Sequence, residues 1–132
     1  MSAADFFTFL RASLSHLETE VPEAHRTLAG VIGQLRARLV ADGDARIIQF
    51  GYAGWTIAQD GDTDLEVAFD RAIIIDLVDG QLTLQDAIEQ ERLRLCGPIG
   101  SIERFHEALL IYLEGMIRAP TAPALLEDYL SA

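Results

Sequence analysis

The chain has 132 residues, 50% of them hydrophobic, and carries a formal net charge of −11. A chain of this length can bury a core as one domain without disulfides or metals, and no apolar run approaches the ~20 residues that cross a bilayer. Because such an acidic surface repels phosphate backbones and anionic lipid leaflets, the composition argues against nucleic-acid binding and stable membrane insertion.

The N-terminal sequence MSAADFFTFL lacks the pattern of a secretory signal, because Asp5 precedes its apolar part and no basic residue does. The single cysteine, Cys96, cannot form an internal disulfide and is expected to fill space in the core. We therefore expect a cytoplasmic protein.

Two helices are predicted for residues 1–43. The first carries apolar side chains, three phenylalanines among them, at helical spacing, and Pro22 is expected to end it. The second follows that proline and is expected to end at Gly43, a residue type that suits a helix C-terminus. Gly30 and Gly33 inside it predict that another element packs closely against this helix.

Residues 44–100 are predicted to form the sheet, with two short helices. Three strands at 46–52, 55–59 and 64–70 are separated by short turns, which predicts an antiparallel meander. Apolar and polar residues alternate strictly in the third strand, so one face of the sheet is expected to be buried and the other wet.

The two short helices and a fourth strand are predicted to follow in order. Asp70 can cap the first helix and Gly80 can end it. Thr83 lies three residues before Asp86, close to a capping box, and starts the second helix. Residues 92–96 alternate again and read as a strand.

Residues 101–132 are predicted to form a long helix and a short amphipathic tail. Ser101 is the expected N-cap, apolar residues repeat along one side as far as Met116, and Pro120 ends the helix. Together the elements predict a single α+β domain over residues 1–132, with an antiparallel twisted sheet and helices packed on one face.

Motifs for catalysis or metal binding are absent from the sequence. His16, His25 and His106 have no metal-ligand spacing, and Leu110 stands where a zinc-protease motif starting at His106 requires a second histidine. The run DGDTD at 60–64 lacks the later ligands of a calcium loop. We therefore predict no metal, no cofactor and no catalytic residue.

Three consecutive segments have the order of a known family. An alternating strand leads into an aliphatic short helix and a glycine (LEVAFDRAIIIDLVDG), then a small helix (LTLQDAIEQ), then a short strand (RLRLCG) and a long helix. This order, over residues 44–117, resembles the sterol carrier protein family of small lipid-binding α/β domains. Family members often carry an acidic residue after the last glycine, whereas here Pro98 follows Gly97, which leaves the ligand type open.

The resemblance implies a non-catalytic protein that binds or transfers a hydrophobic small molecule (a lipid, fatty acyl or sterol-like compound) in an apolar cavity. A buried chain of ~10 methylenes at about 0.8 kcal/mol each would gain ~8 kcal/mol before ordering costs. The expected lining residues are Phe50, Trp55, Ile57, Leu65, Val67, Phe69, Ile74, Leu77, Leu93, Leu95, Phe105, Leu109, Leu113 and Met116.

Two alternatives stay open at the level of sequence, because the same residues would also suit a filled core. One is an accessory module that docks on a protein partner or a second copy through its apolar terminal helices. The other is an enzyme that uses an apolar pocket with one acid or base, for which His25 and His106 are the candidates.

Overall fold

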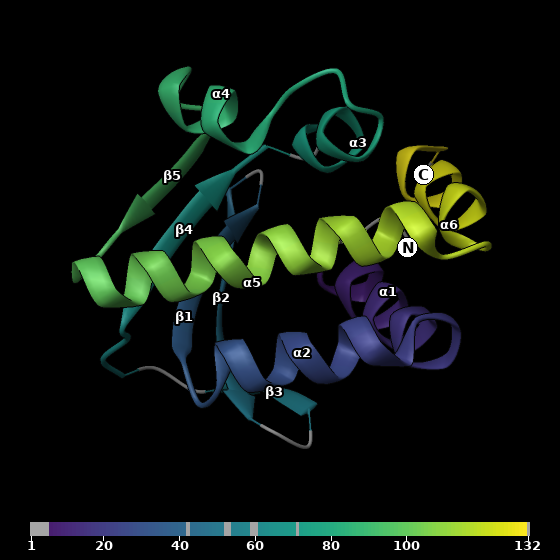
Figure 1. The fold of residues 1–132 in the computed structure, drawn as a ribbon. Coiled ribbons are helices and arrows are strands. Elements are labelled where there is room, and N and C mark those ends of the chain that lie inside the picture. Colours follow the sequence, from purple (N-terminus) through teal and green to yellow (C-terminus); the bar gives the residue numbers. More distant parts are fainter. Residues whose placement is uncertain (1–5, 42, 52–53, 59–60, 71, 132) are drawn as a thin grey trace.

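The computed structural model describes residues 6–41, 43–51, 54–58, 61–70 and 72–131. In chain order the elements are α1 (Phe6–Glu20), α2 (Pro22–Ile32), β1 (Arg36–Ala41), β2 (Asp44–Gly51), β3 (Gly54–Ala58), β4 (Leu65–Phe69), α3 (Ile73–Val78), α4 (Leu84–Glu89), β5 (Leu93–Cys96), α5 (Ile99–Arg118) and α6 (Ala122–Ser131). The helices α2 and α5 cross one face of the sheet side by side (Figure 1). The predicted α+β fold with helices on one face is confirmed.

The sheet is mixed and mostly antiparallel, with the strand order β3-β2-β1-β4-β5. β1 lies at its centre, antiparallel to β2 and parallel to β4. The outer pairs, β2 with β3 and β4 with β5, are antiparallel. The predicted three-stranded meander is therefore wrong, because β4 pairs with β1 and not with β3.

The central strand β1 occupies residues that the sequence pattern assigned to a helix. α2 ends at Ile32, and Gly33 adopts φ +57°, a conformation that favours glycine and turns the chain out of the helix. Leu35 and Leu39 have the spacing of a helical face, yet buried and exposed residues alternate along β1. The prediction of a helix as far as Gly43 is thus wrong, and the segment 1–43 is not purely helical.

One face of the sheet is buried under the helices and the other is open. Leu65, Ala37 and Ile48 form a row across the three central strands and are 1%, 0% and 0% exposed. On the opposite face Arg38 and Glu66 are exposed neighbours with their charged groups 3.9 Å apart. The predicted alternation between a buried and a wet face is confirmed.

Cys96 lies at the end of the edge strand β5 and is exposed. It pairs with Glu66, so both residues belong to the open face of the sheet. The expectation that this cysteine fills space in the core is wrong.

The end of α3 and the start of α4 are as their local sequence predicts. α3 is followed by Gly80 at φ +77°, which terminates it. The Thr83 hydroxyl accepts the backbone N–H of Asp86 at 3.0 Å and caps α4. These turn signals were readable because each depends on residues only three or four positions apart.

Asp70 does not cap α3 through its side chain, contrary to the prediction. The helix begins after Ala72, which offers no side-chain cap. The Asp70 carboxylate instead accepts two hydrogen bonds from Arg92, whose guanidinium also donates to Asp76 at 2.9 Å. These bonds, to Asp70 first and Asp76 second, raise the pKa of Arg92. They join the residue before β5 to the end of β4 and to the middle of α3.

The long helix α5 begins two residues before the predicted N-cap Ser101, directly after Pro98. Proline suits this position because its fixed φ matches a helix start and its missing N–H would have no partner there. No single helix in the described part of the chain is long and apolar enough to cross a membrane. α5 and α6 reach that measure only as a pair bent by 108°.

Gly115 of α5 is the glycine at which helices approach closely. A Cβ atom there would lie 2.5 Å from Leu17 of α1 and 3.2 Å from Ala24 of α2. Gly30, in contrast, is exposed and has nothing within 4 Å of a Cβ position. The prediction of close packing at Gly30 is therefore wrong, and the contact lies on another helix.

Candidate functional site

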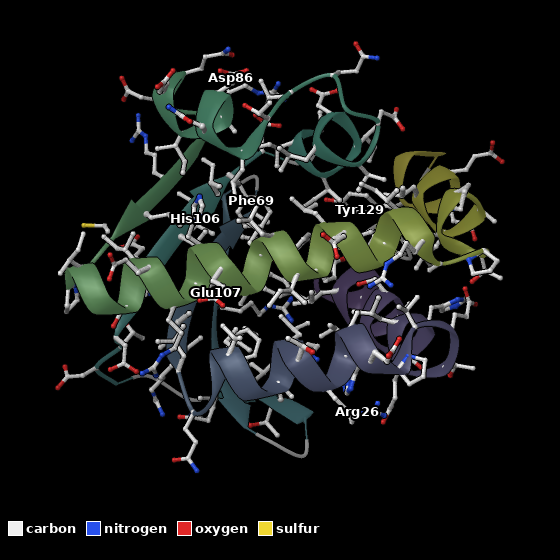
Figure 2. The ribbon with its side chains drawn as sticks, in the orientation of Figure 1. Arg26, Phe69, Asp86, His106, Glu107 and Tyr129 are labelled. Carbon is white, nitrogen blue, oxygen red and sulfur yellow. The ribbon has the colours of Figure 1, made fainter. Side chains whose placement is uncertain are left out.

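An apolar cavity of about 120 Å³ lies between the buried face of the sheet and the helices α1, α2, α3 and α5. Figure 2 shows Phe69 behind α5, on the covered side of the sheet. An engineered cavity of ~150 Å³ lined by similar side chains stays dry and takes up benzene. The space as it stands therefore holds a group of about one ring, and a longer ligand must protrude from it or push the helices apart.

The strands supply one wall of the cavity. Phe50 of β2 and Trp55 of β3 are register partners, and Leu39 and Val67 are partners on β1 and β4. Paired residues of neighbouring strands point to the same face. All four therefore point toward the helices, and the alternation of the strands places them there.

The second helix supplies the opposite wall through one helical stripe. His25, Leu28, Ala29 and Ile32 stand at positions i, i+3, i+4 and i+7 of α2 and all line the cavity. α1 adds Phe6, Leu10 and Leu14, which follow one another at four-residue spacing. The two N-terminal helices thus close the cavity over the β2–β3 side of the sheet.

The Tyr112 hydroxyl is a polar group buried beside the cavity. It lies 2.7 Å from the Ser13 hydroxyl, which donates its own proton to the Leu10 carbonyl at 2.9 Å. Because a serine hydroxyl has one proton to give, Tyr112 is the donor in the pair. Burial raises the pKa of Tyr112, against the opposite effect of the Ser13 bond. The phenol is therefore neutral at physiological pH and adds no charge to the cavity.

The cavity opens between α1, α2 and the β2–β3 hairpin. Leu14, His25, Gly51, Gly54 and Trp55 line both the cavity and a wider, more polar vestibule outside it. Those residues therefore form the mouth, as far as the described part of the chain shows. The vestibule adds four polar residues that the cavity lacks: Arg11, Ser15, Glu18 and Thr56.

No protein-family model matches the chain, and no curated protein matches it by sequence. Solved structures do match. The sterol carrier protein domain 2 of Helicoverpa armigera has a TM-score of 0.55 at 13% identity, with 82% of this chain and 87% of that chain covered. The UbiJ-SCP2 ubiquinone synthesis protein has a TM-score of 0.54 at 19% identity, with 68% and 74% covered. A conserved hypothetical protein of Thermus thermophilus has 0.52 at 16%, with 87% and 90% covered. The chain has a sterol carrier protein-like fold.

Within this sterol carrier protein-like fold, most of the predicted lining residues come together around the cavity. Residues from the strands and from two helices contribute. They are Phe50, Trp55, Val67, Phe69, Ile74, Leu77, Leu93, Phe105 and Leu109. Their role in binding a ligand stays a prediction.

Five of the predicted lining residues lie elsewhere. Leu65, Leu113 and Met116 are buried in the packed core, at 1%, 7% and 1% exposure, and do not line the cavity. Leu95 is half-buried on the edge strand β5. Ile57 points to the covered face but is 46% exposed, because β3 is the other edge strand.

Sequence reasoning missed the contribution of α1 and α2 to the sterol carrier protein-like cavity. Their apolar stripes were visible, but nothing in them says which stripe faces the sheet and which faces another helix. Missing β1 as a strand also removed Leu39 from the wall. The residues not predicted are Phe6, Leu10, Leu14, His25, Leu28, Ala29, Ile32, Leu39, Gly51, Gly54, Ile73, Ala108 and Tyr112.

Of the three histidines, His25 alone lines the cavity. His106 lies on the edge of α5 toward α4 (Figure 2), and His16 hydrogen-bonds Thr121 near the turn before α6. In the part of the chain that the structure describes, no group of three His, Cys, Asp or Glu residues is placed to hold a metal ion.

Proposed function

We propose that this protein binds and transfers a hydrophobic small molecule, of the lipid, fatty acyl or sterol-like class, without chemical conversion. The observation that carries the proposal is the almost wholly apolar cavity of about 120 Å³ that opens into a more polar vestibule. The similar structures that are named sterol carrier proteins support it at the level of fold.

Affinity would come from apolar area removed from water, at about 0.8 kcal/mol for each buried methylene. Pockets that bury a drug-sized ligand measure ~300–1,000 Å³, so the cavity must widen to take a long chain whole. The helices are the walls that can move, because no strand hydrogen bonds hold them.

The alternative of a docking module loses its main support in the structure. Phe6, Phe7 and Phe9 are 9%, 3% and 2% exposed, so the aromatic N-terminus is buried within the chain. Phe9 stacks on Tyr129 of α6 at 4.4 Å between ring centroids, and Figure 2 shows Tyr129 turned inward. These aromatic side chains are buried against one another and are not available as a docking surface.

An enzymatic role would have to rest on His25, at the mouth. In the described part of the chain no carboxylate hydrogen-bonds its ring, so no group orients it as a general base. The carrier role needs no such group, and we therefore favour it.

Cavity filling tests the proposal. Ala29 lines the cavity and is half-buried, so Ala29→Phe should occupy the space and lower uptake of a hydrophobic probe by about tenfold or more. Ala124→Phe makes the same change on an exposed site of α6 and should leave uptake unchanged. Uptake is measured by native mass spectrometry after delipidation and reloading with palmitate or cholesterol. Equal uptake by the two variants would contradict binding in this cavity.

A further inference from the structure

Arg11 lies in the vestibule beside the mouth. Its guanidinium lies 4.6 Å from the centroid of the Trp55 ring, and among the described residues no carboxylate pairs with it. The chain carries a net charge of −11, so acidic partners are abundant. Ion pairs with carboxylates are formed by Arg38, Arg46, Arg92, Arg94 and Arg118. Arg26 and Arg104, like Arg11, form none with the described residues, so it is the position of Arg11 beside Trp55 that distinguishes it.

The contact with Trp55 fixes where this charge lies. Trp55 lines both the cavity and the vestibule, so a cation over its ring sits at the boundary between the apolar and the polar space. A guanidinium can stack on a ring and still point its N–H groups sideways at an oxyanion. The contact with Trp55 therefore holds the Arg11 guanidinium in place, with N–H groups left to bind an anion.

Besides Arg11, the vestibule is lined by both hydrogen-bond donors and an acidic group. His25 and Ser15 offer an imidazole N–H and a hydroxyl as donors, whereas the Thr56 side chain points to the open face of the sheet, opposite to Trp55. Glu18 is the acidic residue there, about two helical turns beyond Arg11 on the same face of α1. Arg11 and Glu18 both line only the vestibule, but Arg11 lies over Trp55, which also lines the cavity, so Arg11 is the charge nearer the apolar space.

We propose that the mouth binds the anionic end, carboxylate or phosphate, of an amphiphile whose apolar part fills the cavity. Arg11 and the His25 ring bind the anion at the rim, and Trp55 holds the guanidinium there. This inference rests on the proposed function, because it presumes that the cavity takes up an apolar chain.

Four ligands with alkyl tails of about nine or ten carbons test the polar end: decanoate, decyl phosphate, decanol and decyltrimethylammonium. Trp55 is the sole tryptophan, so its fluorescence reports occupancy directly, and calorimetry provides a second readout. We expect the two anions to bind about tenfold more tightly than decanol, about 1.4 kcal/mol, and the cation to bind worst. The ratio of decanoate to decyl phosphate affinity then tells a fatty acid from a phosphorylated lipid as the source.

Two variants in the vestibule should change the affinity for decanoate in opposite directions. Arg11→Gln should cost decanoate about tenfold in affinity and leave decanol unchanged, while Glu18→Gln should strengthen decanoate binding a few-fold by removing a like charge. Both residues are exposed, so the fold should survive. Arg104→Gln, on an exposed site outside the mouth, makes the same charge change as Arg11→Gln and should have no effect.

The outcomes separate the two proposals. If decanol binds as well as the anions, or if Arg11→Gln and Arg104→Gln weaken decanoate equally, the anionic-end proposal is overturned while the carrier proposal stands. If none of the four ligands binds, or if Ala29→Phe does not reduce their binding, the carrier proposal fails. The anionic-end proposal then fails with it.

Discussion

Gly115 shows how a single missing side chain sets the spacing of three helices. Leu17 of α1 and Ala24 of α2 occupy the space where its Cβ would be, and Leu17 is fully buried. Toward the N-terminus of α5, the side chains of Phe105, Leu109 and Tyr112 line the cavity. The helices are thus packed without gaps at one end of α5 and leave a space toward the other.

Gly115→Ala should destabilise the protein even though alanine is the better helix former. The helix gains about 1 kcal/mol from the replacement, but forcing an atom into a packed site costs ~1–3 kcal/mol, and Ala24 on its helix backbone has little room to retreat. Urea unfolding followed by circular dichroism measures the difference. Gly100→Ala, in the same helix with nothing within 4 Å, is the control and should not destabilise; a stabilised Gly115→Ala would contradict the packing.

At the scale of elements, α6 is joined to α1 through Glu20 and Thr121. The Glu20 carboxylate accepts both the hydroxyl and the backbone N–H of Thr121, the residue just before α6. These two bonds, the hydroxyl's first, lower the pKa of Glu20, and His16 adds a smaller effect in the same direction. The contact between α1 and the start of α6 therefore depends on an ionised Glu20 carboxylate.

The contribution of Glu20 to stability should vanish in acid. Because its pKa is lower in the folded state, the contribution is present at pH above the ordinary value of 4.5 and is lost as pH falls through the folded pKa. Glu20→Gln should therefore melt below the wild type at neutral pH, with the gap narrowing as pH falls below 4.5. Thermal unfolding at a series of pH values measures this, and a gap that does not change with pH would refute it.

The elements could be predicted from the sequence wherever the signal was local. Gly80 and Thr83 mark the short helices by turn and cap chemistry that acts over three or four residues. The prediction missed β1 because the spacing of Leu35 and Leu39 fits both a helix and a strand. Its parallel partner β4 lies far along the chain, so no local signal pointed to the pairing.

The candidate site was predictable to the same extent as the sheet. Alternation decides which strand residues face inward, so Phe50, Val67 and Phe69 were found. Which helix covers which part of a sheet is set by tertiary packing, and His25 and Arg11 were therefore not seen as neighbours of one opening.

At the scale of the whole molecule, a void of about 120 Å³ per molecule is about 70 mL per mole, well within the ~20–100 mL/mol by which proteins commonly shrink on unfolding. Pressure favours the state of smaller volume, so the empty cavity should lower the pressure at which the protein unfolds. Filling the void, by Ala29→Phe or by an added ligand, should raise the midpoint of pressure unfolding. High-pressure fluorescence of Trp55 measures this midpoint, and no shift on filling would speak against an empty cavity. The same void makes the unloaded protein the more compressible form, so that uptake of a ligand stiffens the molecule as a whole.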